Sequence, residues 1–597
     1  MGSETAISEA DTAFGVSNSF SGRRWKLREP GEASIRALTQ AGNISAALAR
    51  ILAARGTAPD ALADILNPTL KRLLPEPNTL KDMERAVARV AAAIANGEKT
   101  AVFGDYDVDG SCSSALLANF LTALGRPPRI YIPDRMTEGY GPNAAAMRVL
   151  KDEGAGLVIT VDCGAAAVVA LTEARNIGLD VIVLDHHAVE TLPPATAQVN
   201  PNQPGDTSGL GYVCAAGVTF LFLVALNRAL RENGWYAANG VAEPDLRDYV
   251  DLVGLATICD VVPLVGVNRA FVRAGLARLS TLARPGLAAL AAVAKTSAPF
   301  TPYHLGFAFG PRINAGGRIG KCSLGVELLS TTDATEAEDI ALLLDIHNRE
   351  RQAIESLILD NAAAMAATQD NAPFLLVSDE GWHPGVVGIV AGRLRERFNK
   401  PAFVAGFEGG LGRGSARSIP GIDIGAMVRA AQEAGVIEAG GGHAMAAGFS
   451  LSPERLGAFR EFLGHRFANT GAAFDAANEL VLDATVSPSG ANVELVAEIA
   501  KAGPYGAGNL EPLIVVPDAR VVFADIVGKD HVKLRVVGGD GARLDGIVFR
   551  AAQTALGQGL LKARGARVHL AGRLKEDNWN GQSRVQIQVE DAAPAGA

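Results

Sequence analysis

The sequence of 597 residues has few cysteines and no excess of positive charge. Its five cysteines are odd in number and form no Cys-x-x-Cys pair, which argues against a disulfide framework and against a thiolate zinc site. A reducing cytoplasm is the compartment that this content favours. The 55 basic and 64 acidic residues give a net charge of −9, so any binding of nucleic acid must use local patches.

Long hydrophobic runs are also lacking. The longest one, around Val213–Leu226, is too short to span a bilayer comfortably and is predicted to be a buried helix. The first twenty residues lack the basic start and apolar segment of a secretory signal, so no membrane association is expected. The hydrophobic content of 48% suffices for several cores, and the length of the chain suggests three or four domains.

The pattern of polar and hydrophobic residues changes along the first third of the chain. Residues 1–20 are polar and Ser-rich, and we expect them to be a disordered lead. Helical segments are predicted between Ser34 and Leu73 and from Lys81 to Asn96. From Thr100 onward, short β-branched runs alternate with amphipathic helices, which is typical of a mostly parallel sheet with both faces covered.

Three carboxylates at alternate positions, Asp105, Asp107 and Asp109, follow the first of these runs. Extended backbone would place them on one side, with Gly110 allowing a turn into a helix that starts at Ser111. Clustered acids repel unless cations lie between them, so we predict a site for hard divalent metals. A calcium loop is a competing interpretation, although its twelfth position would be Leu116 instead of Glu. A solvated acidic turn is another.

More metal-type side chains follow other predicted elements. Asp162 and the sequence Asp185-His186-His187 each come directly after a strand, and Asp260 ends an apolar, helix-like segment. An isolated Asp is more often a cap or a turn residue. Because the carboxyl ends of parallel strands meet at one edge of a sheet, the repeated coincidence favours a common site.

Basic side chains offer contacts for phosphate. Arg135 follows a strand end, and two interpretations are open: an exposed loop arginine, or a side chain that contacts phosphate. Arg312, Asn314 and Arg318 lie among glycines at 311–320, predicted to be a turn that a nucleic-acid backbone can approach. After a long helix over Thr331–Ala367, a second α/β unit is predicted, and it carries Arg413, Ser415, Arg417 and Ser418, then Gly442 and His443. These residues suggest a phosphate cradle, or alternatively a hairpin tip and a glycine helix stop.

The pattern becomes all-β from about Glu479, with a helix at Asn492–Lys501. Short alternating strands in this number suggest a small barrel of the OB type, a common binder of single strands. The segment Lys501–Glu590 has 13 basic and 9 acidic residues, a local charge of +4. Four aromatic side chains are candidates for stacking on bases, of which we expect one or two to be exposed: Tyr505, Phe523, Phe549 and Trp579.

The motifs GDYDVDG, VDCG, LDHH and CDVVPL, in this order, resemble those of the DHH phosphoesterase superfamily. PRINAGGRIG, WHPGVVGIVAGRL, GRGSARS and GGGHAMAAGFS are similar to the RecJ family of single-strand-specific DNA exonucleases within it. The resemblance covers residues 22–592. Gly316 stands where the family has Ala, and Cys112 where Thr is usual. Neither is a predicted ligand.

The resemblance implies two manganese or magnesium ions. Asp105 and Asp107 would hold one ion; Asp109, His186 and Asp260 would hold the other, with Asp162 bridging both and His187 facing the substrate phosphate. Two ions of this kind serve phosphodiester cleavage. In the family the counterpart of Arg135 helps to hold the terminal phosphate.

The fold class that follows is two α/β domains joined by a long helix, then an OB-type barrel. We expect a DHH catalytic domain at 21–330, a connecting helix at 331–370, a DHHA1 domain at 371–475 and an OB domain at 476–597. The resemblance implies a cytoplasmic, monomeric 5′ to 3′ exonuclease that releases mononucleotides in DNA repair and recombination. Single-stranded DNA would be its substrate, and a single-strand-binding protein and a helicase its partners.

Two other functions are compatible with parts of the sequence. A DHH phosphoesterase for short oligonucleotides or cyclic dinucleotides would not need the additional barrel. A catalytically inactive DNA-binding scaffold would have lost metal ligands, and none is lost here.

Overall fold

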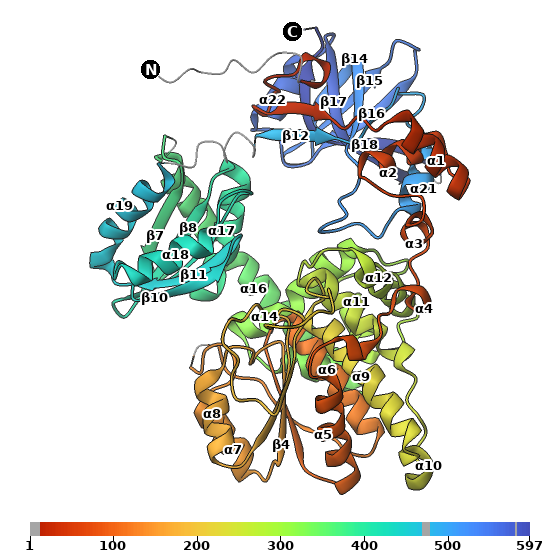
Figure 1. Ribbon diagram of the computed structural model, residues 1–597. Helices are drawn as coiled ribbons and strands as arrows, with labels where there is room; N and C mark the ends of the chain where they lie inside the picture. The colour runs from red at the N-terminus through yellow and green to blue at the C-terminus, as the bar shows by residue number, and fades with distance from the viewer. Residues whose placement is uncertain (1–11, 136, 370, 469–477, 580–581, 597) are drawn as a thin grey trace. The chain divides into compact units, whose positions relative to one another are not determined.

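The computed structural model describes residues 12–135, 137–369, 371–468, 478–579 and 582–596 (Figure 1). The chain forms two compact units. One unit contains Pro68–Ser356 together with Pro504–Leu510, and the other contains the described residues of 1–67, 357–503 and 511–597. Residues before 68 group with the C-terminal part, and the predicted long helix is divided between Ser356 and Leu357, while the expected domain bounds stay a prediction.

A five-stranded parallel sheet forms the centre of the first unit, in the order β3-β2-β4-β5-β6. Its strands are β2 (Thr100–Gly104), β3 (Arg129–Tyr131), β4 (Leu157–Val161), β5 (Asp180–Leu184) and β6 (Ala197–Val199). The predicted parallel sheet is confirmed. The three-residue strand β6 is the one that the sequence analysis did not anticipate.

Alternate residues of these strands enter two different cores. Val102 of β2 lies in the core under one set of helices, whereas Ala101 and Phe103 lie in the core on the opposite face. Period-2 geometry in a doubly covered sheet explains this split. In Figure 1 the two sets of helices lie on either side of β4. One set is α5 (Met83–Asn96), α6 (Val108–Ala123) and α9 (Ala215–Glu232); the other is α7 (Ala144–Asp152) and α8 (Val168–Asn176).

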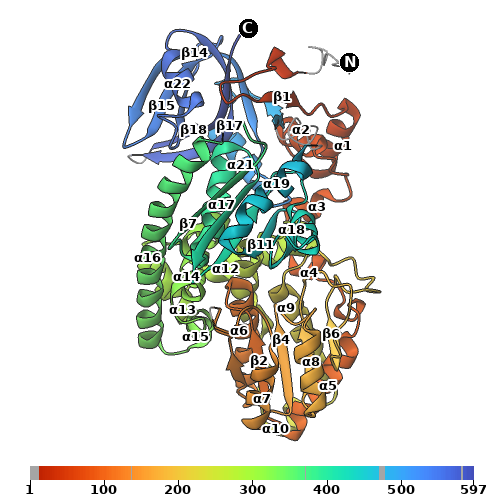
Figure 2. The same cartoon turned by 90° about the vertical axis from the view of Figure 1, so that its left-hand side faces the viewer.

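Helices complete this unit beyond the sheet. They are α4 (Leu70–Leu73), α10 (Trp235–Asn239), α11 (Val250–Cys259), α12 (Gly266–Leu279), α13 (Pro285–Val293), the π-helix η5 (His304–Phe309), α14 (Gly310–Ile319), α15 (Leu324–Ser330) and the start of α16 (Ala334–Ala367). The predicted long helix is confirmed as α16, which Figure 2 shows along its length. The predicted glycine-rich turn at 311–320 is wrong, because these residues form α14.

The second unit holds a mixed sheet and a barrel. The sheet order is β10-β11-β9-β8-β7, from β7 (Leu375–Glu380), β8 (Ala402–Glu408), β9 (Leu411–Arg417), β10 (Ala439–His443) and β11 (Ala446–Leu451). Its helices are α17 (Pro384–Phe398), α18 (Ile424–Glu433) and α19 (Leu456–Phe467). The predicted second α/β unit is therefore confirmed.

The barrel closes because β14 pairs with β15 on one side and β17 on the other. Its strands are β13 (Ala484–Thr485), β14 (Ile514–Val527), β15 (His531–Val537), β16 (Arg543–Val548), β17 (Arg567–Trp579) and β18 (Gln582–Pro594). Two helices accompany them, α21 (Val493–Lys501) and α22 (Ala555–Lys562). The predicted fold class, two α/β parts and an OB-type barrel, is confirmed.

The N-terminal segment packs against this barrel. Strand β1 (Arg24–Leu27) pairs in parallel with β12 (Glu479–Leu482), and the buried Trp25 donates from Nε1 to Asp591 Oδ2 at 2.9 Å. The 3-10 helix η2 (Ala13–Gly15) precedes β1, and α1 (Glu32–Gly42), α2 (Ala46–Ala54) and α3 (Leu62–Leu66) follow it. The expected disordered lead is thus wrong for residues 12–20, while residues 1–11 lie outside the described part.

All five cysteines are free thiols, as the sequence analysis expected. Across the stretches of chain that the structure describes, no helix has both the length and the apolar character needed to cross a membrane.

Candidate metal centre

The first acidic motif lies where β2 passes into α6. Asp105 directly follows the strand, Asp107 caps the helix by accepting a hydrogen bond from Gly110 N at 3.0 Å, and Asp109 lies in the first turn. The three acids are therefore not on one extended segment, because Asp107 is extended while Asp109 is helical, and the helix begins before the expected Ser111. Gly110 serves close packing rather than a turn, because a Cβ there would lie 2.5 Å from Asp105 O. A strand precedes the motif, which excludes the helix–loop–helix geometry of a calcium loop.

The other acids arrive from neighbouring elements. Asp162 follows β4 with a left-handed φ of +57°, and Asp185 follows β5. Asp260 caps the C-terminus of α11. The chain leaves β2 for β3 on one side and then crosses to β4 on the other, so the carboxyl ends of β2 and β4 flank the crevice where such sheets bind ligands.

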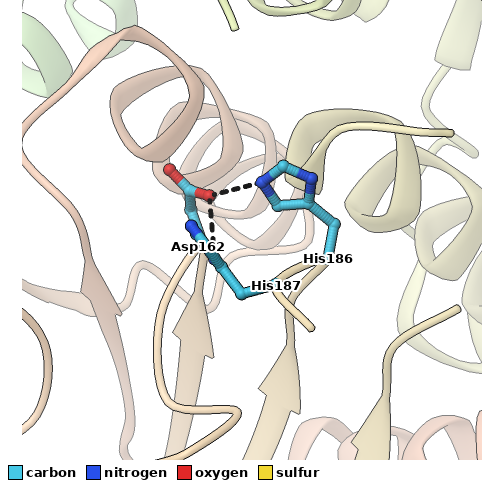
Figure 3. A group of neighbouring side chains, drawn as sticks. All are labelled: Asp162, His186 and His187. Carbon is cyan, nitrogen blue, oxygen red and sulfur yellow. Dashed lines mark ion pairs between the residues drawn. The ribbon is translucent and has the colours of Figure 1, made fainter. Parts of the chain in front are cut away.

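Three overlapping groups of potential ligands result, each with its ligand atoms within 4.8 Å of one another. The groups are Asp105, Asp107 and Asp162; Asp109, His186 and Asp260; and Asp162, His186 and His187. Figure 3 shows the third group, in which Asp162 Oδ1 lies 3.4 Å from His186 Nε2 and 4.0 Å from His187 Nδ1. His186 Nε2 is 3.4 Å from Asp162 Oδ1, 3.7 Å from Asp260 Oδ2 and 3.8 Å from Asp109 Oδ2.

The acids of this centre are held away from water. Burial, then the charge of Asp107, raises the pKa of Asp109 to about 7, and burial, then Asp109 and Asp107, raises the pKa of Asp260 to about 9. Burial likewise raises the pKa of Asp105 and of Asp162 well above the usual range. Without a cation, these carboxyls would hold protons that exposed acids release.

The donor set suits a pair of hard cations. Three buried oxygens accept no hydrogen bond from any described residue: Asp105 Oδ1, Asp162 Oδ1 and Asp260 Oδ2. Orphaned buried oxygens are costly unless something pairs with them, and a divalent cation does so. Five carboxylates and one imidazole favour Mn²⁺ or Mg²⁺ over zinc. The six predicted ligands thus lie close together, and their division between two ions stays a prediction.

Asp185 has a role that the sequence analysis missed. It is buried, and its Oδ1 lies 2.8 Å from His187 Nδ1 while also accepting hydrogen bonds from the backbone N–H groups of His186 and His187. Burial opposes the charge on His187, but the hydrogen bond to Asp185 prevails and raises the pKa of His187 to about 9. Asp185 therefore orients a protonated His187, instead of serving as a ligand as its strand-end position suggested.

Two tyrosines border the centre. Tyr140 donates from its hydroxyl to Asp162 O at 3.0 Å, and its ring meets that of His187 edge-on at 6.0 Å. An exposed tyrosine in a loop gave no signal in the sequence. The guanidinium of Arg135 lies 5.3 Å from the centre of the Tyr106 ring, which places it beside the first acidic motif.

Helix α14 places its predicted contact residues differently from a turn. Arg312 donates from Nε to the buried Asp345 Oδ1 at 2.9 Å, and it therefore ties α14 to α16. Asn314 and Arg318 are half-buried on the same helix. The glycines serve close packing here, because a Cβ on Gly317 would come within 3.0 Å of the Tyr106 ring.

The proposed phosphate cradle in the second unit is built on strands. Arg413, Ser415 and Arg417 alternate along β9 and share one face, and Arg417 donates to Ser415 Oγ at 2.8 Å. Gly442 and His443 end β10, and His443 pairs with Ala446 across a two-residue turn into β11. The alternative of a glycine helix stop is therefore wrong, whereas that of a hairpin fits these two residues. Ser418 is a correction to the predicted contacts, because it is 1% exposed and donates its hydroxyl to Ile422 O at 2.7 Å.

Two of the four candidate aromatics have described side chains on the barrel. Phe549 is 53% exposed, and Phe523 is half-buried beside the guanidinium of Arg564. Tyr505 belongs to the first unit and not to the barrel, and the side chain of Trp579 lies outside the described residues. Phe549 is thus the exposed candidate among the described side chains of this set.

Comparison with known proteins agrees with this architecture. Family models match residues 99–257 as a DHH family N-terminal domain, residues 371–469 as a DHHA1 domain and residues 482–591 as a RecJ OB domain. The single-stranded-DNA-specific exonuclease RecJ of Escherichia coli is 35% identical over 92% of this chain and 96% of its own length. That of Bacillus subtilis is 34% identical over 96% of this chain and 71% of its own length.

A solved structure is similar over almost the whole chain. RecJ from Thermus thermophilus in complex with Mn²⁺ is matched with a TM-score of 0.80 and 30% identity, over 96% of this chain and 80% of that one. The order of the three domain models, the identity over nearly full length and the shared architecture lead to one conclusion: this chain belongs to the RecJ family.

Proposed function

We propose that this protein is a divalent-metal-dependent exonuclease that degrades single-stranded DNA in the 5′ to 3′ direction to mononucleotides, in DNA repair and recombination. The proposal is supported by linked groups of potential ligands, which suit two ions bound side by side. Asp162 belongs to one group with Asp105 and Asp107 and to another with His186, and His186 also belongs to the group of Asp109 and Asp260. Manganese and magnesium complexes of RecJ from Thermus thermophilus support the choice of ions.

The chain's own residues would divide the work. Asp105 and Asp107 would hold one ion, Asp109, His186 and Asp260 the other, and Asp162 would bridge them. When bound, a pair of such ions lowers the pKa of water and stabilises both the attacking and the leaving oxygen in phosphodiester cleavage.

Charge and position give His187 its role. With a pKa of about 9, it carries a proton at neutral pH and can donate a hydrogen bond to a phosphate oxygen that gains charge in the transition state. Asp185 holds the ring by Nδ1 at 2.8 Å, so Nε2 is the nitrogen that points onward to the substrate. Arg135, beside Tyr106, is placed to neutralise a terminal phosphate.

The second unit holds further candidate contacts for DNA. Arg413, Ser415 and Arg417 on one face of β9 are candidates for the DNA backbone, with Gly442 and His443 on β10. On α14, Asn314 and Arg318 remain candidates for contacts with DNA. Arg312 forms an ion pair with Asp345 that supports the fold. A reducing cytoplasm fits the five free thiols. A monomeric state and partnership with a single-strand-binding protein and a helicase stay predictions.

Strands labelled at either end test this function. The protein is incubated with Mn²⁺ and a single strand that carries its label at the 5′ or the 3′ end, beside a blunt duplex of the same sequence. We expect immediate release of a labelled mononucleotide from the 5′-labelled strand, late release from the other, and a stable duplex. Internal fragments at early times would contradict exonuclease action, and immediate release from the 3′ label would contradict the polarity.

A further inference from the structure

A tight hairpin at Pro504–Leu510 belongs to the same compact unit as the metal centre, although Gly503 and Glu511 on either side of it group with the barrel. Gly506 and Asn509 exchange backbone hydrogen bonds of 3.0 and 3.2 Å, and Asn509 Nδ2 donates to Pro504 O at 2.8 Å. The hairpin is therefore a small closed structure that the barrel's chain inserts into the other unit.

The hairpin is fitted to the turn that follows Asp260. Ala507 O accepts a hydrogen bond of 2.7 Å from Leu264 N. A Cβ on Gly506 would lie 2.8 Å from Leu264 Cδ1, and a Cβ on Gly508 would lie 2.8 Å from Pro263 Cβ. Gly508 is therefore required by the closeness of the Pro263 backbone as well as by its own positive φ of +67°, whereas a Cβ on Gly506 would displace the Leu264 side chain.

The turn that the hairpin contacts is under strain. Val261, the residue after Asp260, has a φ of +60° and is 68% exposed. A β-branched residue in the left-handed region costs about 1–3 kcal/mol and persists only where its surroundings impose it. Here one restraint is Asn268, which donates from Nδ2 to Pro263 O at 2.9 Å, and the other is the hairpin.

The backbone of this turn determines where the Asp260 carboxylate lies. Asp260 Oδ2 is buried 3.7 Å from His186 Nε2 and accepts no hydrogen bond within the described part of the chain. Among the described residues, no hydrogen bond to Oδ2 therefore holds the carboxylate end of this side chain in place. Metal ligands must be placed within about 0.2 Å, so a small relaxation of the turn moves this oxygen out of range.

We propose that the hairpin Pro504–Leu510 is a positioning element of the metal centre, which holds the strained turn so that Asp260 can bind its ion. The inference rests on the proposed metal site. It means that a piece of chain inserted between two barrel elements sets the affinity of one of the two ions, the one that Asp109, His186 and Asp260 would hold.

Two glycine variants of the full-length protein separate positioning from general damage. Gly508→Ala inserts a methyl group between the hairpin and Pro263, whereas Gly541→Ala makes the same change at a positive φ of +78° with nothing within 4 Å. Binding of Mn²⁺ is followed by electron paramagnetic resonance of the free ion, and folding by the melting transition. We expect Gly508→Ala to weaken one of two Mn²⁺ sites about ten-fold and to leave the other unchanged, and Gly541→Ala to change neither.

Opposite results would overturn the proposal. If Gly508→Ala binds Mn²⁺ with unchanged affinity at both sites but melts at a lower temperature, the hairpin only stabilises the fold. Equal weakening of both Mn²⁺ sites would lead to the same conclusion. If Gly508→Ala does not fold, Asn509→Ala, which removes the hydrogen bond to Pro504 O, decides between the same outcomes. The unmodified protein, which should bind Mn²⁺ at two sites, is the reference. If it does not, the metal-dependent function itself is refuted.

Discussion

Replacement of Asp162 by asparagine should have opposite effects on activity and on metal-free stability. Asparagine is preferable to alanine because the residue has a φ of +57°, which asparagine adopts more readily. The substitution keeps the shape of the side chain and removes one charge. Asp162 is 2% exposed and is shared by two ligand groups, so both ions would lose an anionic ligand.

The expected loss of activity is large. If each ion is weakened by about ten- to a hundred-fold, as for lost supporting groups of metal sites, the combined loss at limiting metal is about 10²- to 10⁴-fold. By contrast, the metal-free protein should become more stable by about 1–3 kcal/mol, because Asp162 Oδ1 is buried without a hydrogen bond among other acids.

Two assays on the same preparation check this prediction. Initial rates of nucleotide release are measured over a Mn²⁺ titration, and melting is followed in a chelator. Asp152→Asn, an exposed acid at the end of α7, serves as the control and should change neither quantity. Activity above about a tenth of the unmodified rate, a barrier change under about 1.4 kcal/mol, would refute the bridging role. A lower melting temperature in chelator would refute the reasoning about the crowded acids.

Three further predictions follow from the same geometry. His186→Ala should weaken Mn²⁺ binding and be partly rescued by excess metal, whereas His187→Ala should bind metal normally and remain slow; rescue of the second variant by metal would reverse the assignment. The pKa values of Asp109 and Asp260 are raised to about 7 and about 9, so the metal-free folded protein retains protons that the unfolded chain releases above about pH 4. The stability of the metal-free protein should therefore fall as the pH rises toward 9. Mn²⁺ should therefore raise the melting temperature more at about pH 8 than at about pH 6, and an equal rise at both would contradict these shifts. Replacement of the exposed Lys533 on β15 by Gln should flatten the dependence of log K for single strands on log salt by about 0.7, and an unchanged slope would exclude a phosphate contact there.

The strands of the first sheet and the acidic residues at their ends could be predicted from the sequence. The runs before Asp105, Asp162 and Asp185 gave the sheet and its ligand edge, because buried parallel strands and their polar ends have a strong local signature. Helix α14 could not be predicted, since three glycines in ten residues favour a turn locally. Only tertiary packing explains them, because a Cβ on Gly310 would meet Cys259, one on Gly316 would meet Leu344, and one on Gly317 would meet Tyr106.

Contacts between distant residues were the other limit. Asp185 looked like a ligand, and only the fold shows that His187 Nδ1 lies against it. Ser418 looked like a phosphate contact beside Arg417, but the next turn buries it. Tyr505 looked like a barrel aromatic, because the sequence cannot show that its hairpin packs beside Asp260 in another unit. For the same reason, a fragment ending near residue 475 is no clean test of the barrel, because it would also lose this hairpin.

The pairing of β1 with β12 has a consequence for synthesis of the chain. The two strands are 455 positions apart, so β1 leaves the ribosome long before its partner exists. At about 5–20 residues per second, the wait is roughly 20–90 s. During that time Trp25, which ends fully buried against Asp591, must remain exposed or be covered by a chaperone. A segment that is made long before its partner strand is thus among the last to fold.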